Sequence, residues 1–238
     1  MTEAVGTAGA GNKAGAHLAV LPRIEVLARS AASVQGPAGE VMAWATTRAA
    51  RRLGHLADGA GRGRLGSPAA LRAVAEAGIA ATTGAIDVYR DGGTVSDMGD
   101  LAWLSVVMAD PWVRDDAYAR MDPQYQAAHR QLWTDLTVWA RPGYVAAPAS
   151  LLAFTALQSG AVKLADRALD RALADRPGYR MALGLRDRIA SGHDAAPLAT
   201  AEQVAAWYER QLRQAPRRTG LNRRGPAKDP GGPEPGRD

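Results

Sequence analysis

The fold is decided by residues 149–177, which read ASLLAFTALQSGAVKLADRALDRALADRP. Alanine and leucine dominate this stretch, and both are strong helix formers. Gly160 interrupts the pattern near its middle, where it permits a tight turn, and Pro177 closes the stretch because proline cannot continue a helix. The stretch therefore predicts two helices joined at Gly160, with the small Ala165 at the place where the helices cross.

The composition of the whole chain agrees with that pattern. Alanine occupies 51 of the 238 positions, whereas phenylalanine occurs once and isoleucine four times. Strands favour β-branched and aromatic residues, so this composition predicts an all-α protein. Hydrophobic residues make up 47% of the chain, which is enough for a core, and we expect a compact multi-helix domain of eight or nine helices. The lack of cysteine excludes disulfide frameworks, cysteine-based zinc sites and thiol nucleophiles.

Signals for helix starts recur on both sides of the 149–177 stretch. Ser67, Asp110 and Asp122 each stand directly before a proline, which joins a capping side chain to a favoured first helical residue. Ser96 and Thr200 are predicted to cap two further helices. The apolar spacing predicts helices over residues 24–34, 37–56, 67–88, 96–108, 123–139, 178–189 and 200–212, a short helix after residue 110, and a glycine-rich loop at 58–66.

Composition and charge divide the chain into three parts. We expect a flexible leader at 1–17, a helical domain at 18–214 and a disordered basic tail rich in proline and glycine at 215–238. Residues 1–208 carry 21 Lys/Arg against 20 Asp/Glu, whereas residues 209–238 carry 8 against 4, so the positive excess lies at the C-terminal end. No stretch reaches the roughly 18 apolar residues of a membrane span, and the first residues do not form a secretory signal. We therefore expect a cytoplasmic protein with no membrane partner.

The stretch 149–177 also resembles one tetratricopeptide (TPR) unit, a pair of antiparallel helices in about 34 residues. Leu152 and Ala153 match packing positions of the first helix, and Leu169 stands where an aromatic residue is usual. No second repeat follows in register, and stacked repeats need about three units for stability. The resemblance implies a single TPR-like hairpin that neighbouring helices cover within one domain.

Seven short motifs follow one another between residues 20 and 192: Leu21-Pro22-Arg23, Gly36-Pro37-Ala38, Tyr89-Arg90-Asp91-Gly92, Val113-Arg114-Asp115, Ala128-His129-Arg130, APASLLAF at 147–154, and Pro177-Gly178-Tyr179. In this order they resemble the C-terminal helical part of domain-of-unknown-function (DUF) family 4192, a family of high-GC Gram-positive bacteria. The resemblance implies a helical fold and supplies no reaction. It also implies that the N-terminal part usual in the family is missing from this sequence.

Four residues are candidates for a binding site, namely Arg114, Asp115, His129 and Trp133. His129 lies four residues after Tyr125 and four before Trp133, on or beside the apolar stripe of its helix. It is either a general base or ligand contact, or a histidine packed among aromatic side chains. The Arg114–Asp115 pair either lines a polar groove or forms ordinary surface ion pairs. The four histidines have no metal-site spacing, so we expect no metal and no cofactor.

Three functional hypotheses follow. The TPR-like hairpin and the lack of a catalytic constellation favour a non-enzymatic adaptor or scaffold that binds a protein or peptide on the surface of the 149–159 helix. The alternative is a nucleic-acid-associated protein that uses its C-terminal cations. The third is an enzyme remnant around Arg114, Asp115 and His129. The C-terminal cations are Arg210, Arg213, Arg217, Arg218, Arg223, Arg224 and Lys228.

Six tryptophans fall in predicted helices. Because the chain has a single phenylalanine, we expect them to supply much of the core volume, although partly exposed tryptophans also serve as binding hot spots. They are Trp44, Trp103, Trp112, Trp133, Trp139 and Trp207.

Overall fold

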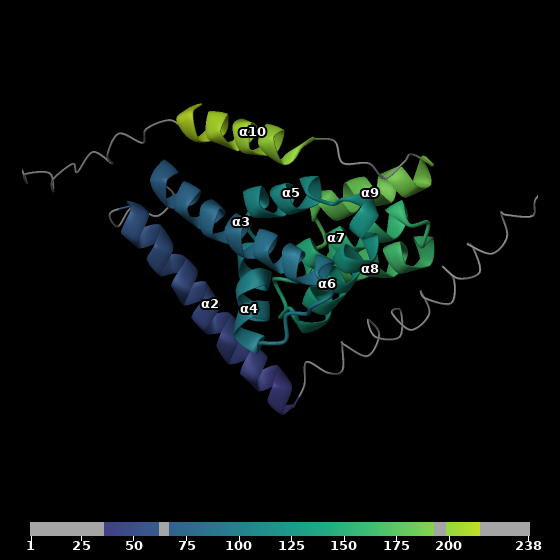
Figure 1. The fold of residues 1–238 in the computed structure, drawn as a ribbon, viewed down its shortest axis with the longest axis horizontal. Coiled ribbons are helices and arrows are strands. Elements are labelled where there is room, and N and C mark those ends of the chain that lie inside the picture. Colours follow the sequence, from purple (N-terminus) through teal and green to yellow (C-terminus); the bar gives the residue numbers. More distant parts are fainter. Residues whose placement is uncertain (1–35, 62–66, 193–198, 215–238) are drawn as a thin grey trace, which may run out of the picture.

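The computed structural model of the protein describes residues 36–61, 67–192 and 199–214. These residues form nine α-helices and one short 3-10 helix and contain no β-strand, so the predicted all-α fold is confirmed for this part of the chain (Figure 1). The elements are α2 (Pro37–Gly61), α3 (Pro68–Arg90), α4 (Met98–Val107), α5 (Pro111–Ala119), η1 (Pro123–Tyr125), α6 (Gln126–Trp139), α7 (Ala146–Gln158), α8 (Val162–Asp175), α9 (Arg180–Ala190) and α10 (Ala201–Gln214). The predicted leader at 1–17, the predicted helix at 24–34 and the predicted tail at 215–238 lie outside the described residues.

Helix α7 forms the centre of the fold. Every residue from 146 to 156 is buried, because this segment has no charged side chain and α6, α8 and α9 pack around it. A helix that is apolar on all sides must be covered by its neighbours. The expectation that the 149–159 helix offers a surface to a partner is therefore wrong for residues 149–156, which are inside the core.

Helices α7 and α8 form the expected hairpin. Gly160 makes the turn with a φ of 68°, a left-handed conformation that glycine adopts without strain. The carboxylate of Asp175, at the end of α8, accepts a hydrogen bond from the amide of Ala146, at the start of α7, so the two helices are antiparallel. Ala165 and Ala168 are fully buried, as close packing of α8 requires. The TPR-like character of the hairpin stays a prediction.

Several predicted helix caps are present. The Ser67 hydroxyl accepts a hydrogen bond from the Ala70 amide at 3.1 Å, and Asp110 caps α5 through the Trp112 amide at 2.8 Å. Thr200 caps α10, since its hydroxyl accepts from the amide of Gln203 while the Gln203 side chain accepts from the Thr200 amide. These caps depend on residues three positions apart or fewer, which explains why the sequence reveals them.

Three predicted boundaries are wrong. Asp97, rather than Ser96, caps α4, because its carboxylate accepts from the amides of Gly99 and Asp100 at 2.8 and 3.1 Å. Helix α2 continues to Gly61, into the loop expected at 58–66, since exposed glycines cost a helix only about 1 kcal/mol each. Asp122 caps the 3-10 turn η1, and α6 begins only at Gln126.

The tryptophans differ in burial, so the expectation that they supply much of the core volume is only partly right. Trp103, Trp112 and Trp133 are buried. Trp44 and Trp207 are 60% and 48% exposed, because each lies on the outer side of a peripheral helix. The remaining one, Trp139, is half-buried. Leucine and alanine from α6, α7 and α8 supply much of the core volume instead.

The peripheral helices α2 and α10 lie along different edges of the domain (Figure 1). Helix α2 packs on α3 and α4 through an apolar stripe that includes the buried residues Met42, Ala45 and Ala49. Helix α10 packs mainly on α5 and has no buried residue. Each helix therefore brings polar and aromatic side chains to the surface.

Candidate functional site

The exposed side of α2 carries a concentration of arginine and aromatic side chains. Arg48, Arg51 and Arg52 are exposed, and none of them forms an ion pair with any residue that the structure describes. Trp44 stands four residues before Arg48, so its ring lies on the same side of the helix. We call Trp44, Arg48, Arg51, Arg52 and His55 the α2 face.

Two guanidinium groups of the α2 face lie on indole rings. The Arg48 guanidinium carbon is 4.6 Å from the centroid of Trp44, and that of Arg52 is 4.3 Å from the centroid of Trp103 on α4. Cation–π contacts of this kind fix the plane of the guanidinium while its edge keeps N–H groups for another acceptor. The arginines are therefore oriented donors rather than freely moving charges.

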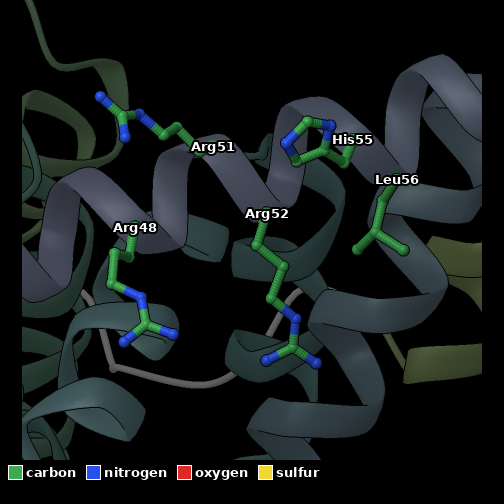
Figure 2. Close-up of a pocket in the computed structure, with 5 residues that line it drawn as sticks. All are labelled: Arg48, Arg51, Arg52, His55 and Leu56. Atoms are coloured by element: carbon green, nitrogen blue, oxygen red, sulfur yellow. The ribbon is translucent and has the colours of Figure 1, made fainter.

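Two neighbouring hollows lie beside these side chains. The first, about 460 Å³, is lined only by α2 residues, and Figure 2 shows Arg48 and Arg52 extending to one side of the helix while Arg51 and His55 leave on another. The second, about 450 Å³, lies between α2 and the start of α4. Its α2 side includes Trp44, Arg48 and Arg52, and its α4 side includes Asp97, Asp100 and Trp103.

The α2 face can bind a carboxylate-bearing ligand, because guanidinium groups match carboxylates in charge and geometry. The sequence analysis missed it. The sequence pattern does indicate this face, since three arginines within five residues share the solvent side of a helix with Trp44. The contact of Arg52 with Trp103 could not be read from spacing, because the two residues belong to different helices.

The structure pairs Arg114 with Asp115, two of the predicted binding residues. Arg114 Nη2 lies 2.6 Å from Asp115 Oδ1, and Arg114 also donates to the hydroxyl of Tyr179, the residue before α9, at 3.2 Å. The other carboxylate oxygen of Asp115 accepts from the Tyr208 hydroxyl of α10 at 2.8 Å. Burial and this hydrogen bond raise the pKa of Tyr208, so the hydroxyl stays a donor. The pair therefore connects α5 to α9 and α10.

His129 and Trp133 lie inside the core. His129 is 1% exposed, and its Nε2 accepts a hydrogen bond from the Asp122 amide at 3.3 Å. Burial, followed by the positive charge of Arg90, lowers the pKa of His129 to about 4, so the ring is neutral at pH 7. Neither of the two hollows beside α2 includes His129, and no hydrogen bond or ion pair of the described residues joins it to Arg114 or Asp115.

The predicted C-terminal cations are only partly within the described residues. Arg210 and Arg213 lie on α10, and Arg213 Nη1 is 3.6 Å from Glu209. The cations Arg217, Arg218, Arg223, Arg224 and Lys228 lie outside the described residues.

Two features are absent from the part of the chain that the structure describes. No helix there is long and apolar enough to cross a membrane. The same residues contain no group of three or more histidine, aspartate or glutamate side chains that could hold a metal ion.

Comparison with known proteins gives one match. The family model with the description "Domain of unknown function (DUF4192)" matches residues 5–196. No curated protein and no solved structure matches the chain. The matched segment includes the α2 face and ends before α10.

Proposed function

The chain belongs to the DUF4192 family, whose description names no activity, and we propose from its own surface that it is a non-enzymatic helical adaptor that binds an acidic segment of a partner protein on the α2 face. The observation that carries this proposal is Trp44, which is 60% exposed and lies under the guanidinium of Arg48. Tryptophan and arginine are the residue types most enriched at the centres of protein interfaces.

The charges of the α2 face favour an acidic ligand. Three exposed arginines without an ion-pair partner in the described residues stand between the acidic residues Glu40 and Asp58. An acidic side chain of a partner would receive charge-assisted hydrogen bonds from them, which are stronger than neutral ones. An apolar or aromatic side chain next to it would rest against the exposed ring of Trp44.

The α4 side of the second hollow favours a peptide ligand over a nucleic acid, because it carries two aspartates. Asp97 and Asp100 line it, and a continuous polyanion would bring its phosphates against these carboxylates. A peptide can place acidic side chains on Arg48 and Arg52 while it presents backbone N–H groups or a basic side chain to the aspartates. Association with nucleic acid through the C-terminal cations stays the alternative.

A selection of short random peptides on the full-length protein tests the proposal. Wild type, the double variant Arg48→Glu/Arg52→Glu and the control Arg167→Glu are used in parallel; Arg167 is an exposed arginine of α8. We expect wild type and control to enrich peptides that combine Asp or Glu with an aromatic residue. The double variant should bind such peptides at least about tenfold more weakly in fluorescence anisotropy. Equal enrichment on all three proteins would contradict the proposal.

A labelled single-stranded oligonucleotide distinguishes the alternative function. If the protein associates with nucleic acid through its C-terminal cations, a chain that ends at residue 214 should lose oligonucleotide binding, and binding by the full chain should weaken steeply with salt. Peptide binding on the α2 face should be the same in both chains. Oligonucleotide binding that Arg48→Glu/Arg52→Glu abolishes would instead assign the α2 face to nucleic acid.

A further inference from the structure

Helix α10 packs on the outside of the domain and lies beyond the residues that the family model matches. The family match ends at residue 196, and ten residues separate Ala190, the end of α9, from Ala201, the start of α10. No residue of α10 is buried. It lies along one edge of the molecule over α5 and next to α3 (Figure 1). The helix therefore has the position of a bound ligand rather than of a core element.

A few directed contacts hold α10 in place. The Tyr208 ring stacks on that of Trp112, with centroids 5.3 Å apart and planes 5° from parallel. The Tyr208 hydroxyl donates to Asp115 at 2.8 Å. Arg72 of α3 forms two hydrogen bonds of 2.8 Å with the Glu209 carboxylate. An aromatic residue and the acid that follows it thus supply the main anchors of α10.

The surface under α10 is organised by contacts within the rest of the domain. Asp115 is held by Arg114, and Arg114 in turn donates to the hydroxyl of Tyr179, the residue before α9. Trp112 follows the cap residue Asp110, whose carboxylate accepts a hydrogen bond from the Trp112 amide. These contacts are made within the rest of the domain and do not involve α10.

One buried donor of the Trp112 ring is left unpaired. The Nε1–H group of Trp112, on the ring that Tyr208 covers, has no acceptor among the described residues. A buried polar group without a partner is unfavourable. A helix that placed a carboxylate or amide oxygen beside this nitrogen would make a contact that α10 does not make.

The contacts of α10 are typical of an element that separates from its domain by local unfolding. The Arg72 and Glu209 side chains are 38% and 28% exposed, and partly exposed ion pairs contribute little to stability. Elements with few buried apolar contacts separate from a domain more readily than core helices do. The α10 surface is thus accessible to a competitor whenever α10 is detached.

We propose that the surface of α3 and α5 beneath α10 is a docking site for an amphipathic helix of a partner protein, and that α10 is its resident intramolecular ligand. The partner helix carries an aromatic residue followed by an acid, as in Tyr208-Glu209, and an acceptor for the Trp112 indole N–H. The partner displaces α10 and binds in its place. This site is separate from the α2 face and does not depend on the function proposed for it.

A labelled peptide of residues 199–214, added to full-length proteins, tests the docking site. Wild type should bind it weakly, because α10 occupies the site. The variants Tyr208→Ala and Glu209→Arg weaken the internal helix and should bind the wild-type peptide at least about tenfold more tightly than wild type does. The control Gln211→Arg changes an exposed residue of α10 and should behave as wild type. Equal binding by all four proteins would overturn the proposal.

A charge reversal locates the peptide on this surface. The Arg72→Glu protein should bind a peptide that carries Glu209→Arg at least about threefold more tightly than it binds the wild-type peptide. No preference between the two peptides would show that they bind elsewhere and would overturn the proposal. Circular dichroism confirms that each variant keeps its helix content.

Two further measurements address α10 itself. Hydrogen exchange of the wild-type protein should be faster in α10 than in α7, and equally slow exchange in both would show that α10 does not detach. Sedimentation of wild type over a range of concentrations should give a monomer. A dimer that Arg72→Glu dissociates would make the α10 of a second copy the occupant and would overturn the assignment to a partner protein.

Discussion

Asp175, the last residue of α8, accepts a hydrogen bond at 3.0 Å from the amide of Ala146, the first residue of α7. Its carboxylate also accepts from the amides of Gly143 and Val145, at 2.6 and 3.1 Å. Helix α7 has no capping side chain of its own, since Val145 stands at the cap position. The first amides of the most buried helix are therefore satisfied by a residue that is 29 positions away in the chain.

Removal of this carboxylate should destabilise the protein. We expect Asp175→Ala to lower the free energy of unfolding by about 2 kcal/mol, because three amide groups lose their acceptor. The control Asp170→Ala removes an exposed carboxylate of the same helix that pairs with Arg186, and should change stability by less than about 0.5 kcal/mol. Urea unfolding followed by circular dichroism measures both. Equal losses in the two variants would show that Asp175 does not act as the cap of α7.

Gly78 marks the closest approach of α3 to its neighbours. A Cβ atom at this position would lie 2.5 Å from Cγ2 of Val113 and 3.1 Å from Cβ of Val107. Gly78→Ala should therefore cost about 1–3 kcal/mol through overpacking, although alanine is the better helix former. Gly84→Ala in the same helix meets no atom within 4 Å and should stabilise by up to about 1 kcal/mol. Thermal unfolding that shifts in the same direction for both variants would contradict this account.

The buried ring of His129 predicts a pH dependence of stability. Its pKa is lowered to about 4 in the folded protein, whereas an unfolded histidine titrates near 6.5. Between these values the unfolded chain binds a proton that the folded protein excludes, so stability falls as the pH is lowered from about 6.5 to 4, by as much as about 3 kcal/mol.

The variant His129→Gln should lose this component of the pH dependence, while the exposed residue His55 offers a control through His55→Gln. Urea titrations at a series of pH values measure the slopes. If His129→Gln retained the wild-type slope between pH 4 and about 6.5, the ring would not be responsible for it.

Truncation to alanine should change the stability of the protein more at a buried tryptophan than at an exposed one. Trp133 is fully buried, so Trp133→Ala should cost about 3–5 kcal/mol. Trp44 is 60% exposed, so Trp44→Ala should change stability by about 0.5 kcal/mol or less while it weakens binding of acidic peptides. Denaturant unfolding and fluorescence anisotropy of the same samples separate the two effects. A large stability loss in Trp44→Ala would remove the reason for assigning Trp44 to binding.

The helices and most of their ends could be predicted from the sequence. Alanine content, the glycine turn at Gly160 and the capping residues Ser67 and Asp110 act through atoms a few residues apart, and local spacing records such interactions. The wrong start at Ser96 has the same local origin, because Ser96 and Asp97 are both good caps and the sequence does not choose between them.

The two proposed binding surfaces form where distant segments of the chain pack together, so local sequence patterns indicate them only in part. Arg114 and Asp115 are neighbours in the sequence, but the contact of Asp115 with Tyr208 joins residues 93 positions apart. The adaptor hypothesis places the 149–159 helix at the surface, although its sequence has no charged side chain and α7 packs among α6, α8 and α9. The α2 face was missed because its charges look like an ordinary solvated helix side until Arg52 reaches Trp103 of α4.

The sequence by itself therefore determined that the chain is helical, where most helices begin, and which family it resembles. Only the tertiary structure decided which helix is central, which tryptophans face solvent and which arginines lack an acid among the described residues. The reason is physical. A helix forms through interactions within one or two turns, whereas burial and pairing depend on side chains that only the packing of separate helices brings together.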